Sequence, residues 1–195
     1  MKPASVSLCS FLALALLTTI AVPRSTQSSD PVATMERKLR HVEGNGKLAH
    51  PDPAPTTFTE KEINAYFASG AVAFPAGVQS ARFEEQPGVV TANTRVDFDR
   101  LKAGINSSNP LLSIFTGVHD VIVVSHAHAS AGKAFIHVDS VSLDGVEIPR
   151  FVLQLFVEKY LRPKYPQAGL DSEFALPDKI DNAAVSSHTL TVTQK

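Results

Sequence analysis

The stretch VHDVIVVSHAHASAGKAFIHVDSVSL, residues 118–143, decides the fold of this chain. Its two halves, 118–129 and 133–143, are rich in residues that favour extended strands. Ala131-Gly132 lies between them and has the length of a tight two-residue turn. The stretch therefore predicts a long β-hairpin, and a hairpin predicts an antiparallel sheet.

Further strands are predicted on both sides of the hairpin. Residues 78–83 and 89–98 lie before it and are separated by a short Pro-Gly turn. Residues 184–193 follow it and alternate polar with apolar side chains, whereas residues 171–177 read as irregular. Because few of these strands alternate with helices, a parallel doubly wound sheet is not expected.

Two segments are predicted to form helices that cover this sheet. The first begins with a capping box, Thr59 followed by Glu62, and carries apolar residues at helical spacing. The second spans residues 150–162 and ends before Pro163. A shorter helix is expected to start near residue 31. The predicted fold class is therefore α+β, with a curved antiparallel sheet packed against two or three helices.

The N-terminal residues predict export. Lys2 is followed by an apolar run at 11–17 and by small residues around 19–21, which is the pattern of a cleaved signal peptide. The whole apolar stretch, 8–22, is shorter than the roughly 20 residues that a membrane-spanning helix needs. An uncleaved membrane anchor is the alternative. We expect a periplasmic or secreted protein.

Three regions follow from these patterns. Residues 1–21 are the predicted signal peptide, and residues 22–56 are a polar leader with a short helix and a proline-rich linker. Residues 57–195 are predicted to form a single α+β domain. Each proline between His50 and Pro55 fixes φ and removes a backbone donor, so neither a helix nor a strand ladder is expected to run through the linker.

Charge and composition exclude several classes of function. The chain has 18 Lys and Arg against 19 Asp and Glu, and this balance does not indicate a nucleic-acid partner. The single cysteine, Cys9, lies in the predicted signal peptide, which excludes thiol catalysis and cysteine-ligated metals in the exported domain. No nucleophile-elbow, phosphate-binding or dinucleotide-binding glycine motif occurs. We therefore expect a protein that is not an enzyme.

The helix predicted over residues 150–162 has more apolar residues than one buried face needs. At about 100° per residue, apolar side chains cover about half of the helical cylinder. Phe151 and Leu155 nevertheless project toward its polar side. One interpretation is a helix that lies deep in the concave side of the sheet. The other is a groove for a hydrophobic ligand or partner.

The order of short motifs along the chain resembles that of a known family. The motifs are Thr59-x-x-Glu62-Ile63-Asn64 opening a helix, Val96-Asp97-Phe98 ending a strand, the long hairpin, Val146-x-Ile148-Pro149 before an apolar helix, and Leu176-Pro177-Asp178-Lys179-Ile180-Asp181 before the last strand. Together they resemble bacterial exported domains related to the tubular lipid-binding (TULIP-like) superfamily, over about residues 57–193. The resemblance implies a strongly curved sheet that wraps a helix, with an acyl chain or similar lipid between them.

The resemblance also implies an apolar interior rather than a set of catalytic residues. Carried over to this sequence, it implies that four helix residues face the interior, namely Ile63, Phe67, Val152 and Phe156. With the two extra apolar positions of the second helix, the predicted apolar ligand site consists of Ile63, Phe67, Phe151, Val152, Leu155 and Phe156.

Three histidines of the hairpin form a second candidate site. His126 and His128 are two residues apart on one strand and share a face, and a two-residue turn at Ala131-Gly132 places His137 opposite His126. Three imidazoles close together suit a tetrahedral zinc ion with one open position. The alternative is that strand alternation directs these side chains to solvent, where they form a pH-sensitive patch.

These patterns favour a non-enzymatic exported domain that binds a lipid or another apolar small molecule between a helix and a curved sheet, without a cofactor. Two alternatives stay open. One is a structural or interaction module of the cell envelope that binds an envelope protein and no ligand. The other is a zinc-binding domain that uses His126, His128 and His137.

Overall fold

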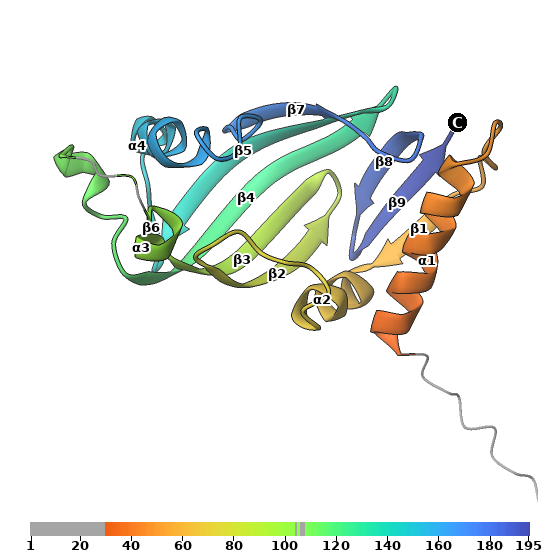
Figure 1. Ribbon diagram of the computed structural model, residues 1–195, viewed down its shortest axis with the longest axis horizontal. Helices are drawn as coiled ribbons and strands as arrows, with labels where there is room; N and C mark the ends of the chain where they lie inside the picture. Colours follow the sequence, from red (N-terminus) through yellow and green to blue (C-terminus); the bar gives the residue numbers. More distant parts are fainter. Residues whose placement is uncertain (1–29, 104, 106–107) are drawn as a thin grey trace, which may run out of the picture.

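The structure is a computed structural model that describes residues 30–103, 105 and 108–195. The predicted signal peptide, residues 1–21, lies outside the described residues. Within the described part, nine strands form one open antiparallel sheet, and helices lie against it (Figure 1). The predicted α+β fold with a curved antiparallel sheet is confirmed.

The strands alternate with turns and short helices along the chain. They are β1 (Thr56–Thr59), β2 (Val78–Gln86), β3 (Val89–Asp97), β4 (Val118–Ser130), β5 (Lys133–Leu143), β6 (Val146–Glu147), β7 (Asp171–Ala175), β8 (Ile180–Ser186) and β9 (Thr189–Gln194). The predicted hairpin is the pair β4 and β5, and its strands are the two longest of the sheet. It is the centre on which the other strands assemble.

The sheet has a large body and a smaller wing. The body places β2, β3, β4, β5 and β7 side by side, with the short β6 at the far end of β5. The wing consists of β8, β9 and β1. A single residue pair in the ladder, Ala129 of β4 with Ala183 of β8, joins the wing to the body. It lies just beyond the pair of His126 with Val89, where β3 begins.

The turn of the central hairpin explains its register. Ala131 and Gly132 both have positive φ, 52° and 76°, as the commonest two-residue hairpin turn requires. His126 consequently pairs with His137, as predicted. A bulge between Val124 and Ser125 shifts the register farther along, and such a shift bends the strands.

Short helices connect and cover the strands. They are α1 (Pro31–Gly46), α2 (Glu60–Ala68), α3 (Phe98–Leu101), the 3-10 turn η1 (Pro110–Leu112), α4 (Arg150–Phe156) and the π-helical turn η2 (Val157–Leu161). The capping box of Thr59 and Glu62 is formed as predicted. Among the described helices, none has both the length and the apolar character to cross a bilayer.

Two separate groups of buried side chains stabilise the fold. The larger group lies between the sheet body and α4–η2, where Phe115 is 1% exposed. The smaller group lies between the wing and the helices α1 and α2, with Met35 and Val42 of α1 packed near Ile63 of α2. The expected domain of residues 57–195 is therefore extended by α1, because the buried face of this helix belongs to the same packing.

The C-terminal part contains more strands than the sequence patterns predicted. Residues 171–175 form β7 at the edge of β5 rather than an irregular segment. The segment 184–193 is interrupted by a two-residue turn at Ser187-His188, so it belongs to two strands and not to one. His188 adopts a φ of +56°, although glycine normally occupies such a turn position. Because no glycine marks the turn, the alternation of polar and apolar residues predicted one continuous strand.

Candidate functional site

An apolar cavity of about 250 Å³ lies between the sheet body and α4–η2. Its sheet wall comes from β3, β4 and β5, and its helix wall from both turns of the α4–η2 segment. Thr94 supplies the only polar side chain among the described lining residues, and its hydroxyl donates to the carbonyl oxygen of Val121 at 3.0 Å. The described lining therefore offers an occupant hydrocarbon surface and one hydroxyl whose hydrogen is already donated.

Strand alternation makes this wall of the cavity apolar. Successive side chains of β4 point to opposite faces, so Val121 and Val123 line the cavity while Ile122 lies on the outer face, 38% exposed. Val141 of β5 stands opposite Val123 in the ladder and completes the wall. The same pattern that predicts the hairpin therefore also produces the lining.

Aromatic rings gather where the helix crosses the sheet. The ring of Phe156 in α4 lies 4.3 Å from that of Phe115 and 5.6 Å from that of Phe98, centroid to centroid. The Tyr160 ring continues the stack at 5.3 Å. Buried aromatic side chains in tilted and edge-on contact pack rigidly, so this side of the cavity has a firm wall.

The helix changes its winding at the cavity. After Phe156 the chain continues as a π-helical turn, and the amide of Arg162 donates to the carbonyl of Val157 at 2.9 Å. Val157 and Leu161 of this turn line the cavity. A π turn is rare, and it is frequently found at functional sites.

The structure separates the apolar residues that sequence reasoning grouped together. Phe156 lines the cavity, and Val152 is buried in the core beside it. Leu155 packs against that core, and Phe151 is 60% exposed. The strand part of the lining was missed because, in these strands, every second residue is apolar whether or not a cavity is present.

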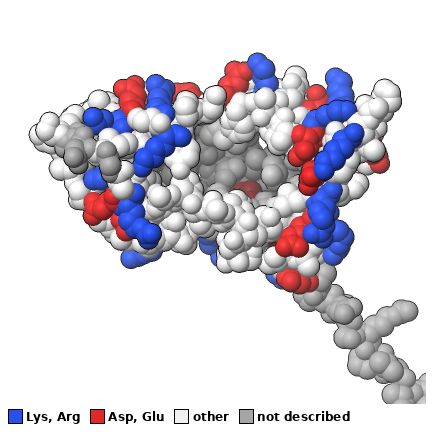
Figure 2. All heavy atoms as spheres, in the orientation of Figure 1, with Lys and Arg blue, Asp and Glu red and all other residues white. Residues whose placement is uncertain are grey.

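The other two predicted residues line a second apolar pocket. Ile63 and Phe67 of α2 face a pocket of about 180 Å³ whose floor includes Phe83 and Val90. By alternation these strand residues lie on the face that also carries Thr94. Figure 2 shows this face hollowed in the middle, between the side of α4 and the side of α1 and α2.

Comparisons of this chain with family models, curated proteins and solved structures find no match. Its function is therefore inferred from its own residues and geometry.

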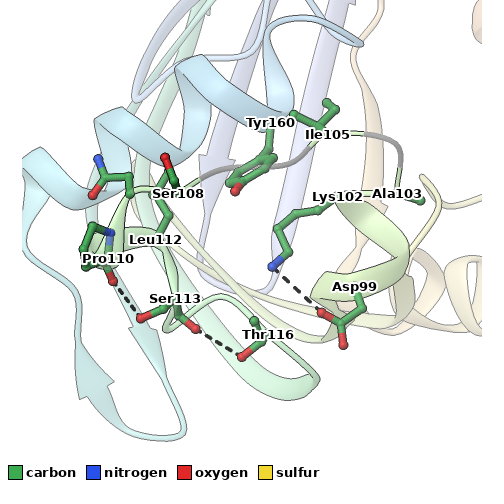
Figure 3. Close-up of a pocket in the computed structure, with 11 residues that line it drawn as sticks. Asp99, Lys102, Ala103, Ile105, Ser108, Pro110, Leu112, Ser113, Thr116 and Tyr160 are labelled. Atoms are coloured by element: carbon green, nitrogen blue, oxygen red, sulfur yellow. Dashed lines mark hydrogen bonds and ion pairs between the residues drawn. The ribbon is translucent and has the colours of Figure 1, made fainter.

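A wider polar hollow of about 450 Å³ lies beside α3 and η1 (Figure 3). Two of its hydroxyl groups serve the local turns, since Ser113 donates to the carbonyl of Pro110 at 2.7 Å and Thr116 to that of Ser113 at 3.1 Å. Lys102 and Asp99 form an ion pair at 3.8 Å. These groups already have partners within the turn, so the hollow makes a weaker ligand site than the apolar cavity.

The hairpin histidines lie on the outer face of the sheet, each with its own partner. His126 Nδ1 lies 2.8 Å from a carboxylate oxygen of Asp139, and the His128 ring stacks on Phe135 at 4.9 Å. His137 hydrogen-bonds Asp171. Among the described residues no group of three metal-ligating side chains is arranged to hold an ion. The zinc site on these histidines stays a prediction that this arrangement does not favour.

Several histidine–carboxylate pairs that lie outside the cavity have shifted pKa values. The hydrogen bond from His137 lowers the pKa of Asp171, with the Arg150 guanidinium acting in the same direction. Glu60 raises the pKa of His188, and His188 lowers that of Glu60. These pairs lie at turns and strand ends, so they contribute to local structure rather than to chemistry in the cavity.

Proposed function

We propose that this protein is a non-enzymatic exported domain that binds a lipid chain or another small apolar molecule in the cavity between α4–η2 and the sheet. The observation that carries the proposal is the lining, which is apolar on every side apart from the hydrogen-bonded Thr94. Export rests on the signal-peptide pattern of residues 1–21.

The size of the cavity agrees with a ligand of this kind. An engineered apolar cavity of about 150 Å³ stays dry and takes up benzene. The cavity of about 250 Å³ therefore suits a segment of an acyl chain or a single ring system. A longer lipid would extend from it into the hollow in the middle of this face (Figure 2).

The absence of reactive groups at the cavity supports binding rather than catalysis. None of the described lining residues carries an acid, a base or a thiol. General acid–base catalysis needs such a group within hydrogen-bond distance of the reacting atom. Binding needs only the removal of apolar surface from water, at about 25 cal/mol per Å².

The test is to look for a bound apolar molecule and then to fill the cavity. We expect native mass spectrometry of the gently purified protein to show a co-purified lipid, and the emptied protein to take up an apolar fluorescent dye. Val123→Phe should weaken dye binding at least tenfold, because the larger ring occupies the cavity. Overpacking costs about 1–3 kcal/mol of stability, so the melting temperature is measured in parallel.

The matched control is Ile122→Phe, one residue away on the outer face. It should leave dye binding unchanged. Absence of both lipid and dye uptake in the unmodified protein would exclude the proposal and favour the interaction module of the cell envelope. Equal loss of binding in the two variants would show that the dye binds elsewhere.

A further inference from the structure

A buried glutamate distinguishes the second apolar pocket from the cavity under α4. Glu85 lies on β2, is only 4% exposed, and lines the pocket together with Ile63, Phe67 and Phe83. Within the described part of the chain, its Oε2 atom has no hydrogen-bond partner. Every other described lining residue of this pocket is apolar.

The backbone holds Glu85 firmly in this position. Its amide donates to Oε2 of Glu60 at 3.3 Å, and its carbonyl accepts from the amide of His188 at 3.0 Å. These bonds join β2 to the start of α2 and to the turn between β8 and β9. Three elements therefore fix the backbone at Glu85, and its side chain is buried at the pocket.

The unpartnered Oε2 atom of this carboxyl group is unfavourable for the fold. Burying a polar group without a partner costs about 1–3 kcal/mol in proteins, and an unpaired charge costs more. Burial raises the pKa of Glu85, and the nearby Glu60 carboxylate raises it further. An apolar residue here would match Val90, its partner in the ladder. A structural role does not explain the group, whereas a ligand that pairs with it does.

We propose that this pocket binds a primary ammonium group carried on a small apolar body, with the carboxylate of Glu85 as its counter-ion. The pocket of about 180 Å³ is of the size that holds a single ring. The rings of Phe67 and Phe83, 4.8 Å apart, add aromatic surface that attracts cations. The site is separate from the cavity under α4 and does not depend on the function proposed above.

The charges around the pocket favour a cation over an anion. The charged groups that act on Glu85 are the Glu60 carboxylate, which repels it, and the His188 imidazole, which attracts it. His188 is engaged with Glu60 through a 2.7 Å contact. The two glutamates therefore share one imidazole, whose direct contact is with Glu60, and a ligand carboxylate would meet both glutamates.

The test compares three probes that share one ring, namely benzylammonium, benzyl alcohol and benzoate. Isothermal titration calorimetry on the folded protein should show benzylammonium binding at least tenfold more tightly than benzyl alcohol, with benzoate weakest. Glu85→Gln keeps the shape of the side chain and should abolish this preference. Glu84→Gln, at the exposed neighbouring position on the other face of β2, should preserve it.

Three outcomes would overturn the proposal. They are equal affinity for the ammonium and the alcohol, tightest binding of benzoate, and an ammonium preference that survives Glu85→Gln. If the Gln variant does not fold, Glu85→Leu replaces it, because an apolar side chain removes the unpaired group. Dye binding in the cavity under α4 serves as an independent control, since it should be the same in all these variants.

Discussion

A single side chain, His119, ties the first residues of β4 to the turn after β5. Its Nδ1 atom lies 2.6 Å from Oδ2 of Asp144, and its Nε2 atom lies 2.7 Å from the carbonyl oxygen of Thr116. Both neighbours are acceptors, so the ring satisfies them together only when both nitrogens carry a proton. The Asp144 hydrogen bond, and after it the Thr116 carbonyl, accordingly raise the pKa of His119.

This pair predicts a pH-dependent effect of His119→Gln. Because the pKa is higher in the folded than in the unfolded protein, the stabilisation is fully present below the unfolded value of about 6.5 and is lost as the pH rises through the folded value. Urea unfolding should therefore show that the substitution destabilises the protein more at pH 5.5 than at pH 9. The same substitution at the exposed His50 is the control for replacing a surface histidine with glutamine. Equal effects of His119→Gln at the two pH values would contradict the prediction.

At the scale of elements, α1 shows how a segment with a leader-like sequence becomes part of the domain. Its last turn is joined to β9 by a buried polar network, in which Nδ2 of Asn45 donates to Oε1 of Gln194 at 2.7 Å. The side-chain amide of Gln194 in turn donates from Nε2 to the backbone carbonyl of Val42 at 2.8 Å. In the middle of α1, Lys38 Nζ lies 2.7 Å from a carboxylate oxygen of Glu62 in α2. The two contacts of Gln194 join residues 149 and 152 positions apart.

Truncation of the buried face of α1 should therefore destabilise the whole wing. Met35 is 8% exposed, and Met35→Ala should cost about 2–5 kcal/mol of unfolding free energy, as is usual for a buried methionine. Chemical denaturation measures this cost. Arg37→Ala, two residues away on the exposed side of the same helix, should be nearly neutral. A neutral Met35→Ala would mean that α1 does not pack in solution.

At the scale of the whole molecule, two separately packed ends leave a hollow between them. The inner face of β4 carries only small side chains at this point, Ser125, Ala127 and Ala129, all half-buried. Beyond β3, the wing is joined to β4 through a single ladder pair, with further backbone bonds such as Gly88 to Val185 at 3.0 Å. The hollow of Figure 2 follows from this thin connection and these small residues.

The same architecture predicts two units of local opening. Hydrogen exchange followed by mass spectrometry should show β1, β8 and β9 exchanging together, at a rate different from that of β4 and β5. Met35→Ala should speed exchange in the first group and leave the central hairpin unchanged. Equal acceleration in both groups would show that the two cores open as one unit.

The features of the fold that could be predicted are those that residues close together in the sequence determine. The two-residue turn at Ala131-Gly132 determines the register of the central hairpin, and the capping box at Thr59 determines where α2 begins. The turn at His188 could not be predicted, because its positive φ is held by contacts with β2 and α2 that are distant in the chain.

The candidate sites depend on tertiary structure more than the central hairpin and the helix starts do. The sequence by itself determined the α+β class, the central hairpin with its pairing of His126 and His137, and an apolar helix at 150–162, because local spacing and turn chemistry specify them. Only the tertiary structure decided how wide the space under α4 is and that the Oε2 atom of Glu85 is buried without a partner among the described residues. Cavity volume and burial depend on distances between elements far apart along the chain, and no local pattern of residues encodes those distances.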